Sequence, residues 1–385
     1  MATLAPSRPA PLATTPGVRA AAVRHLGPNW YASVMGTAVV ATAGANLPVH
    51  VPGLRTACTA VWALSSVLLL ALLTARALHW IHHRDRAREH LLDPAVAPFY
   101  GCLSMALLAV GGGTLLLGRD WIGLPAALAI DTVLFTAGTL IGLAAAVAIP
   151  YLMVVRHHIE AASPVWLLPV VAPMVSAALG PLLLPHMPAG QARETLLIAC
   201  YALFGISLLA TLTMLPLVFG RLVTGGPPPL ALTPTLFLVL GPLGQSTTAA
   251  NTFADAAPGV LPAPYAHGFG AFAVLYGVPV MGFALLWLAL AGALVLRARR
   301  RGMGFALTWW AFTFPVGTCV TGAEGLARHT GLDAFRWLAI ALYAVLVAAW
   351  LVAATHTLRG LVSGALLAGP GSARSAPRRA RVRTT

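Results

Sequence analysis

The sequence predicts an all-α integral membrane protein, with ten transmembrane helices arranged as five parallel helical hairpins in a ring around a central pore. Charged residues make up 9% of the chain and hydrophobic residues 58%, whereas soluble domains are about a quarter charged and a little under half apolar. Ten apolar stretches are each long enough to cross a bilayer, which takes about 20 residues. They recur as pairs whose starting points lie 66 to 71 residues apart, a period typical of repeat architecture; these starts are near Asn29, Pro98, Pro164, Leu232 and Met303.

The ten stretches are predicted to be helices rather than barrel strands. Backbone N–H and C=O groups in lipid need partners within the protein, and continuous apolar runs of this length satisfy that need as helices. Each hairpin crosses the membrane twice, so all five hairpins enter it in the same direction. The predicted spans cover residues 29–47, 56–78, 98–117, 124–152, 164–184, 194–219, 232–251, 268–296, 303–326 and 334–357.

The distribution of arginine predicts the topology, since the chain contains no lysine. With both ends in the cytoplasm, the inner segments carry 19 of the 24 arginines, as the excess of positive charge in cytoplasmic loops requires. We expect a multi-pass protein of the inner (plasma) membrane with a disordered cytoplasmic tail at 1–27, a transmembrane domain at 28–357 and an Arg-rich cytoplasmic tail at 358–385. The net charge of +14 then points to anionic lipid headgroups as partners and not to nucleic acid.

The odd-numbered helices of the hairpins carry Gly or Pro in mid-membrane. Helix breakers are tolerated there when the freed carbonyl groups are buried in protein or face a watery cavity. At helical spacing they share a face with small and hydroxyl side chains. We expect five such faces to enclose a narrow pore, although small-residue stripes also serve simply to let helices pack closely. The predicted pore-lining residues are Gly36, Thr37, Gly101, Ser104, Gly111, Pro173, Ser176, Gly241, Gln245, Thr248, Gly317 and Thr318.

Four motifs on odd helices resemble those of the tellurite-resistance/dicarboxylate transporter family. That family includes malate transporters, fungal sulfite efflux pumps, the bacterial tellurite-resistance protein and plant slow anion channels. The resemblance covers residues 28–357. The motifs are PNWYASVMGT at 28–37, DPAVAPFYG at 93–101, GPLGQS at 241–246 and WWAFTFP at 309–315.

The resemblance implies a quasi-fivefold ring of hairpins, a pore through each protomer and a homotrimer. It implies transport of a small anion: a C4-dicarboxylate such as malate, sulfite, tellurite or an inorganic monovalent anion. A phenylalanine on the ninth helix plugs the pore in this family, and the matching residue is Phe314, with Phe312 as the lesser candidate. Neither an enzymatic activity nor a cofactor is implied.

Two acidic residues fall inside predicted spans, Asp131 in the fourth and Glu324 in the ninth. A buried charge there costs a few kcal/mol unless it is paired or protonated, so both are candidates for proton coupling. This keeps open a proton-coupled sulfite exporter or dicarboxylate carrier as the alternative to a passive channel. The simpler interpretations are an interfacial carboxylate beside Arg328 for Glu324 and hydrogen bonding between helices for Asp131.

A distant alternative is a membrane di-iron enzyme, because His79, His82 and His83 match the HxxHH box of such enzymes. Those sites need several boxes, and the other candidates, His90 and the pair His157–His158, lack the spacing. We expect a basic loop at the membrane surface instead, and no metal.

Overall fold

The computed structural model describes residues 26–156 and 161–366, and within them it contains helices and no strands. Most of the two predicted tails lies outside the described residues. The first hairpin comprises α2 (Tyr31–Asn46) and α3 (Leu54–His82), and the short helix α4 (Arg84–Leu92) follows it. The later hairpins comprise α5 (Tyr100–Gly113) with α7 (Leu124–Val155), α8 (Leu167–Leu179) with α9 (Gln191–Gly225), α10 (Leu240–Ala256) with α11 (Ala263–Arg300), and α12 (Phe314–Thr330) with α13 (Asp333–Val362).

Short tight turns of helix extend the first member of each hairpin. Five are 3₁₀ segments that precede the α-helix: η1 (Pro28–Trp30), η2 (Ala97–Phe99), η4 (Pro164–Trp166), η6 (Leu230–Val239) and η7 (Leu307–Phe312). After α5 the chain continues as the π-helical segment η3 (Thr114–Gly118) and α6 (Arg119–Ile122), and after α8 as the 3₁₀ segment η5 (Gly180–His186). The Gly and Pro residues of the odd helices therefore divide these helices into pieces, as breakers of the regular hydrogen-bond ladder do.

Seven helical segments are long and apolar enough to cross a membrane. They are α3, α7, α9, α11, α13 and the two composite segments Ala97–Ile122 and Pro164–His186. The other three predicted spans contain α2, α10 and α12, which have only 16 or 17 residues each. By length and composition alone, the structure thus supports a multi-pass helical membrane protein with seven candidate spans.

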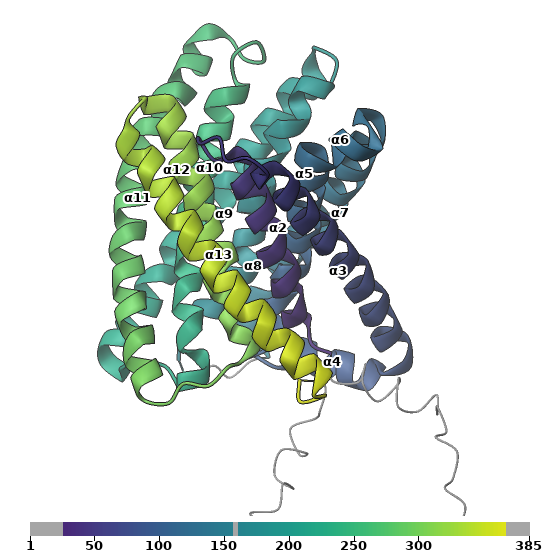
Figure 1. The fold of residues 1–385 in the computed structure, drawn as a ribbon, viewed down its shortest axis with the longest axis vertical. Helices are drawn as coiled ribbons and strands as arrows, with labels where there is room; N and C mark the ends of the chain where they lie inside the picture. The colour runs from purple at the N-terminus through teal and green to yellow at the C-terminus, as the bar shows by residue number, and fades with distance from the viewer. Residues whose placement is uncertain (1–25, 157–160, 367–385) are drawn as a thin grey trace, which may run out of the picture.

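The five hairpins pack so that their first helices contact one another in a closed cycle. α2 contacts α5, α5 contacts α8, α8 contacts α10, α10 contacts α12, and α12 returns to α2. We call these five the inner helices; each also contacts the second helix of its own hairpin. In Figure 1, α3 and α11 lie on opposite sides of the molecule, with α2 and α8 between them. In the second helices, 17% to 33% of the most apolar 18-residue stretch is buried, against 89% in the composite segments of α5 and α8.

Close approach of the inner helices explains several of their small residues. A Cβ atom added at Gly101 would lie 2.4 Å from the backbone oxygen of Leu168 on α8, and one added at Gly244 would lie 2.5 Å from the backbone of Thr318 on α12. There is no room for a side chain at these positions, so glycine occupies them, as at other tightly packed helix contacts in membranes.

The segment after α3, predicted as a basic loop, is the helix α4 instead. Arg86 lies one turn from Glu89 and forms an ion pair with it, and Ala87 is fully buried against the body of the protein. Polar residues on the remaining faces leave α4 as a short amphipathic helix. At the other end of the chain, α13 continues to Val362, five residues past the end of the tenth predicted span.

Candidate functional site

Phe314 is the first residue of α12 and directly follows Thr313, which separates η7 from α12. Thr313 separates the two segments with φ −98° and ψ −78°, values displaced from those of a regular helix but still in the right-handed helical region, and its hydroxyl donates to the Trp310 carbonyl at 2.7 Å. Pro315 then occupies the first turn of α12, where its missing N–H is not needed. This break aims the Phe314 side chain into the centre of the inner helices, where it is 4% exposed.

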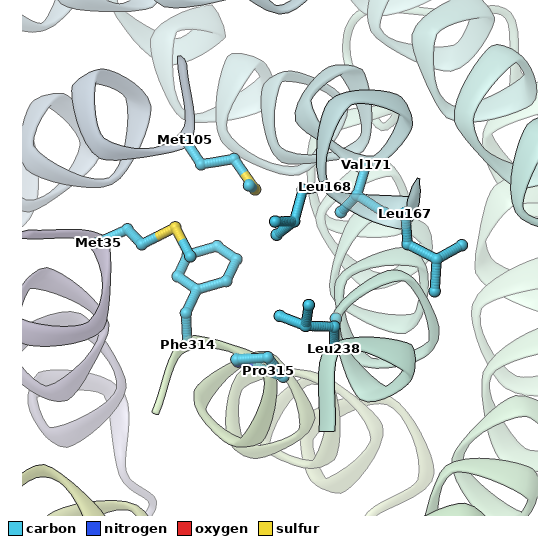
Figure 2. Close-up of a pocket in the computed structure, with 9 residues that line it drawn as sticks. Met35, Met105, Leu167, Leu168, Val171, Leu238, Phe314 and Pro315 are labelled. Atoms are coloured by element: carbon cyan, nitrogen blue, oxygen red, sulfur yellow. The ribbon is translucent and has the colours of Figure 1, made fainter. Parts of the chain in front are cut away.

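An apolar constriction lies on one side of the Phe314 ring. Its cavity measures only about 10 Å³, room for about one water molecule. Figure 2 shows the ring beside the side chain of Met35, with Met105 and Leu168 nearby. All five inner helices or their 3₁₀ extensions contribute to its wall, which consists of Met35, Met105, Leu167, Leu168, Val171, Leu238, Gly241, Phe314 and Pro315.

A larger chamber of about 400 Å³ lies on the other side of the same ring. It extends toward the end of the bundle where the two helices of each hairpin are joined, at the level of Asn46, Leu182 and Asp255. All five inner helices contribute here as well. Phe314 is the residue that lines both spaces, so its ring forms the partition between them.

The chamber wall is rich in hydroxyl and amide groups. Thr248 and Thr321 face each other across α10 and α12, with their hydroxyl oxygens 2.7 Å apart. Thr42, Gln245 and Thr252 complete a neutral polar surface. Such groups solvate an anion through single hydrogen bonds and not through a bidentate clamp, so an anion would be held loosely.

Four ionisable groups lie in or near the part of the chamber farthest from Phe314. Arg328 donates to Asp255 at 3.0 Å, and His329 lies 3.3 Å from the same carboxylate. Deeper in the chamber, Glu324 is 2% exposed, and its Oε1 has no hydrogen-bond partner among the described residues. The arginine is therefore largely balanced by Asp255, while the Glu324 carboxyl group remains without a comparable partner.

The structure brings five of the predicted site residues to these two spaces. Gly241 lines the constriction, Gln245, Thr248 and Glu324 line the chamber, and Phe314 lines both. A Cβ added at Gly241 would meet nothing within 4 Å, as expected of a glycine that faces open space. Phe312, the lesser candidate for the plug, packs in an aromatic cluster instead, with its ring 4.8 Å from that of Phe237.

The remaining predicted lining residues make their contacts between helices. The Thr37 hydroxyl accepts from the Trp350 indole on α13, Ser104 donates to the Gly138 carbonyl on α7, and Ser176 accepts from Thr139 on α7. Thr318 donates to carbonyl groups of its own helix and α10. Pro173 is buried within α8.

The other predicted glycines, and Asp131, lie at helix contacts too. A Cβ added at Gly36 would meet Thr313, and one added at Gly317 would meet Val39. A Cβ added at Gly111 would lie 2.6 Å from Oδ1 of Asp131, which places that carboxyl group at the contact of α5 with α7.

Sequence reasoning missed the bulky wall of the constriction. Met35 and Met105 look like ordinary core residues in the sequence. A signal was present on α2, however, because Met35, Val39, Thr42 and Asn46 recur at helical spacing and all four line one of the two spaces.

The histidines of the HxxHH box do not form a metal site within the described residues, which contain no group of three or more His, Cys, Asp or Glu side chains able to hold a metal ion. His79 is buried and stacks on His90 of α4, with ring centroids 5.4 Å apart, while Nδ1 of His82 lies 2.9 Å from the carbonyl of Leu78. Through this stacking, His79 packs α3 against α4.

A helical membrane body, with an aromatic partition between a polar chamber and an apolar constriction, defines a transport protein of the channel or carrier class. The model of the voltage-dependent anion channel family matches residues 25–358, and the chain belongs to this family. That confirms the family resemblance predicted from the four motifs. The family comprises channels and transporters of anions and not enzymes.

Relatives support the same class. An uncharacterized transporter of Methanocaldococcus jannaschii is 24% identical over 90% of this chain and 96% of its own length. Sulfite efflux pumps of Trichophyton rubrum and of Arthroderma benhamiae are each 26% identical over 86% of this chain and 89% of their own length.

Proposed function

We propose that this protein conducts small anions across a membrane through the space enclosed by the five inner helices, with Phe314 as the gate. The observation that carries the proposal is that Phe314 lines both the chamber and the constriction. Anions gather in the polar chamber, and the ring, together with the apolar wall behind it, forms the barrier. A dry apolar segment of this width opposes an anion because it offers no replacement for lost hydration.

This proposal takes all five inner helices as membrane crossings. The closed cycle of contacts among them supports ten crossings in five parallel hairpins, because the short inner helices are continued by 3₁₀ or π segments. The arginine distribution supports placing both chain ends in the cytoplasm, so that the chamber opens to the outside. A homotrimer in the inner membrane remains the expectation from the family resemblance.

Among the anions, we infer that sulfite is the first to test. The sulfite efflux pumps align over most of this chain, and a chamber of about 400 Å³ has room for sulfite with part of its hydration shell. Malate, tellurite and monovalent inorganic anions fit the neutral wall as well, because the Gln245 amide group in that wall can donate a hydrogen bond to any oxyanion.

The test is anion flux through the purified protein in liposomes, with chloride, nitrate, sulfite and malate compared for the wild type and Phe314→Ala. Removing the ring joins chamber and constriction, and we expect flux to rise at least about tenfold, a barrier change of ~1.4 kcal/mol. Phe312→Ala is the matched control, since it removes an equal ring from the aromatic cluster. Equal flux of wild type and a well-folded Phe314→Ala would refute the gate.

A second candidate is a proton-coupled exporter of sulfite or carrier of dicarboxylates. It is favoured by Glu324, because its buried carboxyl group lines the chamber and Oε1 has no hydrogen-bond partner among the described residues. In that case only one anion moves, its flux needs a pH difference across the membrane, and Phe314→Ala abolishes transport. The response of wild-type flux to an imposed pH gradient separates the two candidates.

A further inference from the structure

A second charged cavity lies far from Phe314, at the opposite end of the bundle from the chamber. It is a groove of about 430 Å³ between the ends of α9 and α11. Because the helices alternate in direction, these ends share one side of the bundle with the described chain ends at 26 and 366. We call it the arginine groove, after Arg221 of α9 and Arg297 and Arg301 at the end of α11, which line it.

The positive charge of the groove is not balanced by acidic side chains among the described residues. Three guanidinium groups face it, and among the described residues no acidic side chain lines it. None of the ion pairs found in the described part of the chain involves these arginines. Nη1 of Arg221 donates to the carbonyl of Gly226 at 3.0 Å, which holds this side chain over the loop and leaves its other N–H groups available.

The rest of the groove is apolar and stiff. Leu230, Leu294 and Ala298 supply aliphatic surface, and three successive prolines at 227–229 form one wall. Proline has no backbone N–H, so the arginines are the donors that an anion would meet. Thr233 is 1% exposed, and its hydroxyl lies 3.3 Å from the carbonyl of Pro229, so it braces the loop.

A cationic rim above an aliphatic floor fits an amphiphilic anion. α9 and α11 are both long and apolar enough to cross a membrane, so the groove lies where such a helix pair leaves the hydrocarbon. Basic pockets between transmembrane helices at the cytoplasmic surface suit the phosphate of anionic lipids, and arginine matches phosphate with paired N–H donors. A free inorganic anion would use the rim and leave the aliphatic floor bare.

We propose that the arginine groove binds the headgroup of an anionic phospholipid of the cytoplasmic leaflet, with phosphate held by Arg221, Arg297 and Arg301. The acyl chains continue along the apolar surfaces of α9 and α11. The site is separate from the anion pathway and does not depend on the function proposed for it.

The test is native mass spectrometry of the full-length purified protein, titrated with phosphatidylglycerol or phosphatidylcholine of the same chain length. We expect phosphatidylglycerol to be retained more tightly. Each arginine near the surface contributes about fivefold to binding of an anionic lipid, so Arg297→Gln with Arg301→Gln should weaken retention by roughly 25-fold. This pair leaves the Arg221 hydrogen bond intact, and adding Arg221→Gln should weaken it further.

The matched control is Arg300→Gln, which removes the same charge from the same helix end but does not line the groove. The proposal would be overturned if the double variant retained phosphatidylglycerol as tightly as the wild type. It would also be overturned if Arg300→Gln lost as much retention as the double variant. Inorganic phosphate is the last arm. If phosphate at the lipid's own concentration displaces phosphatidylglycerol completely, the occupant is a free anion and the lipid assignment fails; persistence of the lipid supports it.

Discussion

The two sides of the Phe314 ring differ in both width and chemistry. On one side a chamber of about 400 Å³ is lined by hydroxyl, amide and charged groups. On the other side the free space is about 10 Å³, and methionine, leucine and valine form most of the wall. An anion can exchange part of its water for protein groups in the chamber, but it cannot do so in the constriction.

In the proposed pathway, this difference places the barrier to transport in the constriction. Opening the gate by rotation of one ring would still leave the anion facing an apolar passage, because Met35, Met105 and Leu168 remain. Selectivity then depends on how readily an anion gives up its water, and a weakly hydrated anion should pass more easily than a strongly hydrated one. In the proposed pathway, the chamber would hold anions loosely and the constriction would set the rate of transport.

The largest effect is expected from refilling the constriction after the gate is removed. Gly241 faces open space there, so Gly241→Leu in the Phe314→Ala background should return flux toward the wild-type level, a loss of at least about tenfold. Thr252→Leu in the same background enlarges a side chain in the wide chamber and should change flux less than about twofold. Anion flux in liposomes is compared for the two double variants. Equal losses of flux would mean that the constriction and the chamber do not differ in how strongly they limit transport.

The next effect concerns the charge in the chamber. An ionised Glu324 opposes anions near it by ~1 kcal/mol across a polar space, so Glu324→Gln should raise flux about fivefold at high outer pH. The increase in flux caused by Glu324→Gln should be smaller at low outer pH, because the wild-type carboxyl group is then protonated and carries no charge. Flux measured against outer pH tests this, with Asp131→Asn as the control at the contact of α5 with α7. A fall of flux to zero in Glu324→Gln would favour the coupled carrier instead.

The sequence predicted the membrane class, the hairpin period and the family from patterns that are local and redundant. On α10, the predicted stripe of Gly241, Gln245 and Thr248 lies along the two spaces; its role in lining a pore stays a prediction. These features depend on hydropathy and spacing alone, so no knowledge of the packing is needed to find them.

The lining faces of α2, α5 and α8 depend on packing, and there the small residues lie at helix contacts. Gly101 illustrates the reason: glycine is required where α5 meets the backbone of α8, and the same residue type would also suit a pore. A hydroxyl group such as that of Thr37 satisfies itself on its own helix, by donating to the Ser33 carbonyl at 2.7 Å. The sequence cannot distinguish such a group from one that faces an anion.

A smaller effect is expected at the mouth of the chamber. Arg328 is balanced by Asp255, so its field on approaching anions is weak and easily screened. Arg328→Gln should lower flux about twofold at low ionic strength, and the difference should disappear above ~0.15 M salt, where the Debye length is about 8 Å. Arg336→Gln, which alters an arginine of α13 near the same end, should have no effect on flux. A salt-independent loss in Arg328→Gln would mean that the guanidinium group contacts the anion directly.

The smallest effect is expected on the pH dependence of thermal stability, in a variant whose anion flux should keep the pH dependence of the wild type. Burial, reinforced by the charge of Arg76, lowers the pKa of His90 from its usual 6.5. The unfolded chain therefore binds this proton more readily, and the folded protein loses stability as the pH falls below about 6.5. His90→Gln should remove that part of the loss, so that the unfolding temperature declines by roughly 1–2 °C less between neutral and acidic pH. Thermal unfolding in detergent measures it, with His82→Gln as the control. The pH dependence of flux should be the same in His90→Gln as in the wild type, because His90 packs α4 against α3 and lies far from the chamber. A changed pH dependence of flux would mean that α4 and the chamber are energetically coupled.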